Sequence, residues 1–180
     1  MAEQLLELFI PLIGWSNMLR FRCSLALRCA MDLTKDVPRS PYEKLGTINF
    51  LPRSIDKARA ELAGTLGEYV WRIGRTERLL DFLGIEQDEF VEALRTRRTD
   101  QAVWAWIQQH MTPRSHEEID VHNKAQASDE PGAGSTWDWP RFRAFLGECG
   151  HGHRDDIRRH FDRLDLDEGR GVPHGGRTDW

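Results

Sequence analysis

The sequence lacks the features that mark secreted and membrane proteins. Its three cysteines are an odd number at irregular spacing, which does not fit a disulfide framework: Cys23, Cys29 and Cys149. Its longest uncharged apolar run extends from Leu8 to Leu19, whereas a membrane-spanning helix needs about 20 such residues. The first charged residues, Glu3 and Glu7, are acidic where a secretory signal is basic. We therefore expect no membrane span and a reducing, cytoplasmic location.

The sequence also lacks the short motifs of the common enzyme classes. It has no Gly-x-Ser-x-Gly elbow, no phosphate-binding glycine loop and no dinucleotide fingerprint. We find no internal repeat of the length that solenoid proteins use. The net charge is −4, and affinity for nucleic acid needs a concentrated basic surface. We therefore expect no nucleic-acid partner.

The 180 residues are 30% charged and 39% hydrophobic, which is typical of one soluble globular domain. Residues 1–31 differ, because they are rich in Leu, Ile and Phe, and Pro11 and Gly14 interrupt their helical periodicity. We expect this segment to be a non-native leader or a flexible extension, with Met31 as the natural start. The alternative is a helix that binds a membrane surface or a partner. The tail 171–180 has three glycines and few apolar residues, and we expect disorder there.

Helix signals dominate the region from 32 to 170, which we expect to be a single helical domain. Ser40-Pro41-Tyr42-Glu43 has the pattern of a capping box that opens a short helix before Gly46. A longer helix is predicted from Arg53 to Ala63, and Gly64 suits its end. Its apolar stripe has the spacing of one helix face: Leu51, Ile55, Ala58 and Leu62.

Further helices are predicted near 79–83, 90–94, 99–107, 115–127, 141–148 and 156–164. No alternating run is long enough for a substantial strand, and residues 70–73 suit a short hairpin arm at most. The sequence therefore predicts a mostly α fold, a single compact domain of about six short helices with irregular loops.

The candidate site lies on and just after the helix predicted at 53–63. At 100° per residue, Asp56 and Lys57 point away from the apolar stripe, and Arg59 lies on its shoulder, about 70° from the centre. Asp56 and Arg59 are three residues apart, which allows an ion pair on the surface. Glu68 and Tyr69 follow the helix end and can fold back towards these charges.

These five residues support two interpretations. In the functional one, Arg59 or Lys57 holds an anionic ligand, and Glu68 or Asp56 acts as an acid or base. In the structural one, they form an ion-pair network that stabilises a loop-rich fold.

Two other polar clusters carry weaker signals. Cys149 and three histidines offer soft and borderline metal ligands, but their spacing matches no regular zinc motif: His151, His153 and His160. We therefore expect no metal and no cofactor. The acidic segment 165–169 does not place glycine and glutamate at the positions that a calcium-binding loop requires. We expect Glu168 and Arg170 to dock the chain end onto the body instead.

Trp104 and Trp106 cannot share a helix face, because they are two residues apart. Trp104 lies beside Val103 and Ile107, so we expect it in the core, which leaves Trp106 as the candidate for an exposed binding surface.

One ordered set of segments extends over roughly Asp32 to Arg170: Asp32-Leu33-Thr34, Arg39-Ser40-Pro41, Ile55-Asp56-Lys57-Ala58-Arg59-Ala60, Gly64-Thr65-Leu66-Gly67-Glu68-Tyr69, Asp81-Phe82-Leu83-Gly84-Ile85 and Phe161-Asp162 through Asp165-Leu166-Asp167-Glu168-Gly169-Arg170. Together these segments resemble the domain of unknown function family numbered 5069. The resemblance implies a small bacterial helical domain with no assigned reaction and no catalytic residue to transfer. Members of that family usually begin near the position of Met31, which supports the expected start.

The leading functional hypothesis is a small-molecule-binding or accessory protein without an assigned reaction, with an anionic small molecule as its ligand. The first alternative is an enzyme that uses a pocket around the five candidate residues. The second is a helical protein-interaction module. A concave pocket that gathers the candidate side chains favours the first two hypotheses, and a flat apolar patch near Trp106 favours the third. The oligomeric state stays open.

Overall fold

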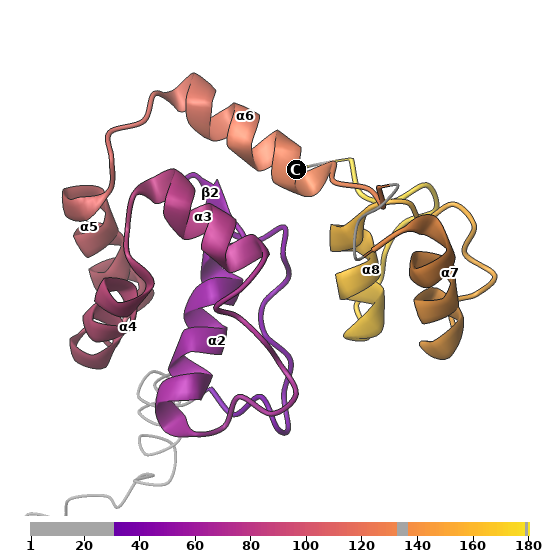
Figure 1. Ribbon diagram of the computed structural model, residues 1–180, viewed down its shortest axis with the longest axis horizontal. Coiled ribbons are helices and arrows are strands. Elements are labelled where there is room, and N and C mark those ends of the chain that lie inside the picture. The colour runs from indigo at the N-terminus through magenta and orange to yellow at the C-terminus, as the bar shows by residue number, and fades with distance from the viewer. Residues whose placement is uncertain (1–30, 133–136, 179) are drawn as a thin grey trace, which may run out of the picture.

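The computed structural model describes residues 31–132, 137–178 and 180, and the fold there is mostly α, as predicted. Seven helices and one pair of short strands occur in these ranges (Figure 1). In chain order the elements are β1 (Lys44–Leu45), β2 (Ile48–Asn49), α2 (Leu51–Ala63), α3 (Arg75–Leu83), α4 (Gln87–Thr96), α5 (Asp100–His110), α6 (His116–Ala127), α7 (Trp139–Glu148) and α8 (His160–Asp167). The leader expected at 1–31 lies outside the described residues except for Met31.

The prediction of a short helix at Ser40 is wrong, although hydrogen bonds between Ser40 and Glu43, as in a capping box, are present. The Ser40 amide donates to Glu43 Oε1 at 3.3 Å, and the Glu43 amide donates to the Ser40 carbonyl at 3.1 Å. These bonds close a turn, and the chain then enters the antiparallel pair β1 and β2. Gly46 has a φ of +60°, which suits a tight hairpin turn and blocks helix continuation. No strand forms at 70–73, where the sequence allowed a short hairpin arm at most.

The predicted core helix is confirmed as α2, and it is the central element of the larger part of the molecule. Its first ten residues, 51–60, are all buried, and Gly64 ends it with a φ of +71°. It contacts α3, α4 and β1. A helix that is covered on every side must bury its polar face as well as its apolar stripe, and this explains the burial of its charged residues.

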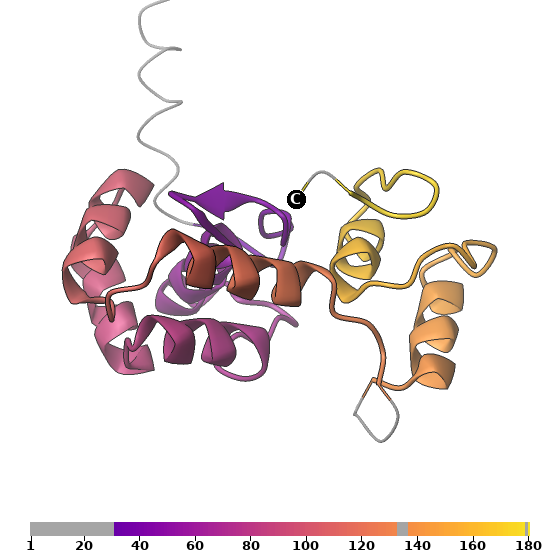
Figure 2. The same cartoon turned by 90° about the horizontal axis from the view of Figure 1, so that it is seen from above.

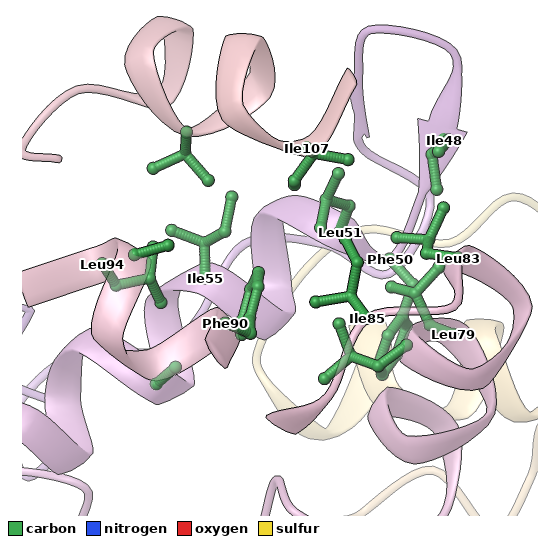
Figure 3. Close-up of a cluster of buried hydrophobic side chains, with 14 of the residues drawn as sticks. Ile48, Phe50, Leu51, Ile55, Leu79, Leu83, Ile85, Phe90, Leu94 and Ile107 are labelled. Atoms are coloured by element: carbon green, nitrogen blue, oxygen red, sulfur yellow. The ribbon is translucent and has the colours of Figure 1, made fainter. Parts of the chain in front are cut away.

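The main core surrounds the apolar stripe of α2, as Figure 3 shows. Ile55 and Leu51 lie between Phe90 of α4 and Ile107 of α5. α6 lies across this part of the molecule and contacts β2 (Figure 2). A capping box begins α6, because Ser115 Oγ accepts from the Glu118 amide at 3.2 Å and Glu118 Oε2 accepts from the Ser115 amide at 2.8 Å.

α8 joins this core to a smaller one around α7. Phe161 at the start of α8 stacks on Phe50, with ring centroids 5.5 Å apart, and belongs to the main cluster. Leu166 near its end belongs to the second cluster, which contains Phe142 and Leu146 of α7. Both views place α8 between α7 and the other helices (Figures 1 and 2). α8 begins at His160 rather than near Asp156, because residues 154–157 form a turn.

Trp104 packs against the main core, as expected, but the expectation that Trp106 is exposed is wrong. Trp106 is the buried one, 8% exposed, with its ring stacked on His110 at 4.5 Å. Trp104 is half-buried and packs against Gly46, where an added Cβ would approach its ring to 2.2 Å. Trp106 therefore offers no exposed apolar patch for a protein partner.

Residues 171–178, for which we expected disorder, contact the body of the molecule. Val172 is buried in the α7 cluster, and the Arg177 amide donates to Asp162 at 3.1 Å. Arg170 pairs with Glu168 and donates to the Pro38 carbonyl, so this segment docks as expected. None of the helices in the described segments has the length and apolar character needed to cross a bilayer.

Candidate functional site

A cleft of about 770 Å³ separates α2 and the loop after it from α7 and α8. In Figure 1, α8 lies across from α2 and this loop. The near wall contains Lys57 and Tyr69, and the far wall contains Phe145 and Arg163. Ligand pockets in proteins commonly have volumes of about 300–1,000 Å³, so the cleft can hold a metabolite.

The near wall is held in place at Gly67. The Leu33 amide donates to the Thr65 carbonyl at 2.9 Å, which joins the segment at 31–37 to the loop after α2. Gly67 has a φ of +62°, and a Cβ there would lie 2.9 Å from the Leu33 carbonyl oxygen. Only glycine allows both this conformation and this close approach.

Lys57 projects from α2 into this wall and is 9% exposed. Its Nζ donates to the Val70 carbonyl at 3.1 Å and lies 5.1 Å from the centre of the Tyr69 ring. Within the described ranges it forms no ion pair with a carboxylate. Burial, followed by the positive charge of Arg53 one turn earlier, lowers the pKa of Lys57 to about 7. Both protonation states are therefore accessible near neutral pH.

Arg163 is the cation of the opposite wall, and it is 7% exposed. Its guanidinium lies 4.1 Å from the Trp137 ring centre and 4.5 Å from that of Phe145. Its Nε has no hydrogen-bond partner, and no carboxylate of the described residues pairs with its side chain. Burial lowers the pKa of Arg163 to about 10, so it stays charged at neutral pH.

The floor between these two cations is an ion pair that is already complete. Arg53 of α2 donates to both oxygens of Glu168, and both side chains are almost fully buried. The Arg53 guanidinium and Arg170 lower the pKa of the Glu168 carboxyl despite its burial. This pair links α2 to the end of α8 and occupies both terminal nitrogens of Arg53, whose Nε has no hydrogen-bond partner among the described residues.

Tyr69 and Glu68 complete the near wall. Burial, and then the negative charge of Glu168, raises the pKa of Tyr69 to about 12, which keeps its hydroxyl protonated. Glu68 is exposed at the entrance. Three of the five candidate residues from the sequence therefore line one cleft: Lys57, Glu68 and Tyr69.

Asp56 and Arg59 lie outside the cleft, and they do not pair with each other as we expected. Arg39 holds Asp56 by two side-chain bonds of 2.9 and 2.7 Å and by its backbone amide. Arg59 donates to Asp100 at 2.8 Å, and Arg39 also pairs with Asp100. These four residues form the structural network that the second interpretation described.

The residues considered for a metal site are dispersed in the structure. Cys149 donates to Asp167, and His151 and His153 lie on the loop after α7. His160 is buried against Phe142, and burial lowers its pKa to about 4. In the described ranges, no three histidine, cysteine or acidic side chains are grouped to hold a metal ion.

The sequence alone does not point to Arg163 and its aromatic neighbours, which are far from Lys57 along the chain. The only signal was compositional, because tryptophans and arginines are frequent between 137 and 163. No spacing along the sequence connects these residues to α2, because it is the turns after α7 that bring Arg163 to the cleft.

Comparison with family models identifies the family of the chain. Residues 35–170 match the model of the domain of unknown function DUF5069. The chain belongs to this family. The match confirms the resemblance seen in the sequence, and it spans both walls of the cleft from Lys35 to Glu168. Comparison with curated proteins gives no match.

Proposed function

We propose that this DUF5069 protein binds a small anionic molecule in the cleft between α2 and α8. The observation that carries the proposal is Arg163, a buried guanidinium on the cleft wall without a carboxylate partner among the described residues. Taking such a charge out of water is costly unless another group compensates for it. The rings of Trp137 and Phe145, 4.1 and 4.5 Å from the guanidinium, compensate in part, and the Nε–H group, which has no partner in the described part of the chain, is available to a ligand.

The charges of the cleft suit a carboxylate or a phosphate. Arg163 supplies a positive charge from one wall and the protonated fraction of Lys57 adds to it from the other, while Glu168 is occupied by Arg53 and Arg170. Arginine binds both anions through two parallel hydrogen bonds. We further propose a cytoplasmic location, which the free thiol of Cys149 favours.

A second hollow, near Tyr42 and Trp180, is less suited to an anion. Its arginines already have partners, because Arg170 pairs with Glu168 and Asp165, and Arg177 pairs with Asp165.

Calorimetric titration with succinate and with inorganic phosphate tests the proposal and separates the two anion classes. We expect one of them to bind the wild-type chain and to bind Arg163→Met about 10- to 100-fold more weakly, the value of a charged hydrogen bond. Methionine keeps an apolar stem beside the rings of Trp137 and Phe145.

The matched control is Arg158→Met. Arg158 also lies over a tryptophan, Trp139, but it is on the surface, is paired with Glu130 and does not line the cleft. We expect this variant to bind like the wild type. The proposal fails if neither anion binds, or if both variants lose affinity equally.

A further inference from the structure

Lys57 has properties that anion binding alone does not require. The chain has four lysines, and the other three are exposed: Lys35, Lys44 and Lys124. Lys57 is instead buried beside the Tyr69 ring, and its one hydrogen bond within the described part of the chain goes to a backbone carbonyl. A buried lysine usually has a carboxylate partner, because an isolated ammonium is poorly tolerated away from water.

The surroundings of Lys57 favour its neutral amine. The charge that acts most strongly on Lys57 is that of Arg53, one turn earlier on the same helix, and Glu168 is paired with that same arginine. Desolvation lowers the pKa of the amine to about 7, so much of it carries a free lone pair near neutral pH. A neutral amine in a cleft is the nucleophile that reacts with carbonyl compounds.

We propose that Lys57 forms an imine with the carbonyl carbon of an anionic aldehyde or keto acid held in the cleft. The inference rests on the proposed function, because Arg163 on the opposite wall would hold the anionic group. It narrows the ligand class from any small anion to one that also carries a carbonyl.

The step is balanced without a further reactant. The Nζ lone pair forms a bond to the carbonyl carbon, and the π electrons of the C=O bond move to oxygen, which takes up a proton. The nitrogen loses one proton to give the carbinolamine, whose hydroxyl takes up a second proton. The nitrogen lone pair then forms the C=N bond as the C–O bond breaks and water leaves, and the iminium loses its remaining N–H proton to give the imine. The products are a C=N bond and one water molecule, and nothing is oxidised or reduced.

Trapping with cyanoborohydride tests the inference on the intact wild-type chain. The probe is succinic semialdehyde near neutral pH, and peptide mass mapping identifies the labelled lysines. We expect Lys57 to be labelled at least about 10-fold faster than the three exposed lysines, because a larger fraction of it is neutral. Labelling of Lys57 at or below the rate of the exposed lysines overturns the inference.

Butyraldehyde is the matched probe, since a methyl group replaces the carboxylate at the same chain length. We expect it to label Lys57 more slowly than succinic semialdehyde does, and we expect Arg163→Met to remove the difference. Equal rates with both probes in the wild type would contradict the assignment of an anionic carbonyl ligand.

The titration with succinate and phosphate separates the two proposals. If an anion binds through Arg163 but Lys57 is not labelled preferentially, the imine proposal fails and anion binding stands. If neither anion binds, the proposed function fails, and the imine proposal fails with it.

Discussion

At the scale of single residues, Lys57 makes the stability of the fold depend on pH. Its amine titrates near 10.5 in the unfolded chain and at about 7 in the folded one. Between these values the unfolded state binds more protons, so the free energy of unfolding rises with pH. The slope from this one group approaches about 1.4 kcal/mol per pH unit in the middle of the interval.

Lys57→Met should remove this contribution while it preserves most of the buried stem. We expect the variant to be more stable than the wild type near neutral pH, with a difference that shrinks as the pH rises towards 10. Urea unfolding of both proteins across this range measures the difference. Parallel profiles would mean that Lys57 keeps its proton in the folded protein, which contradicts the account of its environment.

The site residues show how far a local pattern predicts function. Lys57, Glu68 and Tyr69 were identified from a capped helix and the loop after it, and they do line the cleft. Arg163 was not identified, because its role depends on Trp137 and Phe145, which only the fold brings around it. Local spacing predicts one wall of a cleft, whereas the second wall depends on tertiary packing.

At the scale of elements, α2 shows both the strength and the limit of helical periodicity. The stripe of Leu51, Ile55 and Ala58 predicted the helix and its core face correctly. The same helical wheel placed Asp56 away from the core, yet this residue is 6% exposed. Periodicity identifies the face that must be buried, but it does not show that other elements also cover the opposite face.

The turn at Ser40 shows a second limit of local signals. A capping box describes a few hydrogen bonds around one turn of chain, and Ser40 and Glu43 make such bonds. Whether a helix follows depends on the next residues, and here Gly46 directs the chain into the β1–β2 hairpin, where Trp104 packs.

The network that anchors α2 predicts unequal effects for its two arginines. Arg39→Met leaves the buried carboxylate of Asp56 with only a backbone partner, which should cost about 3–5 kcal/mol of unfolding free energy. Arg59→Met leaves Asp100 paired with Arg39 and partly exposed, which should cost about 1–2 kcal/mol. Urea unfolding compares the two variants directly.

The test is which of the two variants loses more unfolding free energy, and we expect it to be Arg39→Met. Equal losses, or a larger loss for Arg59→Met, would contradict the hydrogen-bond pattern described above. Arg59→Met should also bind succinate and phosphate like the wild type, because Arg59 does not line the cleft.

At the scale of the whole molecule, the cleft exists because α8 connects two cores. Phe161 packs with the main cluster and Leu166 with the cluster of α7. The Arg53–Glu168 pair fixes the distance between α2 and the end of α8. The sequence predicted most of the helices and the docking of Glu168 and Arg170, but not the cleft, since the Arg53–Glu168 pair that closes its floor joins residues 115 positions apart.

The most direct test of the central claim is a crystal structure of the full chain grown with succinate or with phosphate, according to which one binds. We predict density for the anion inside the cleft, with its oxygens on the Arg163 guanidinium and near Lys57 Nζ. An empty cleft in which Arg163 has turned to pair with Asp167 would contradict the claim, because the buried cation would then serve the fold rather than a ligand.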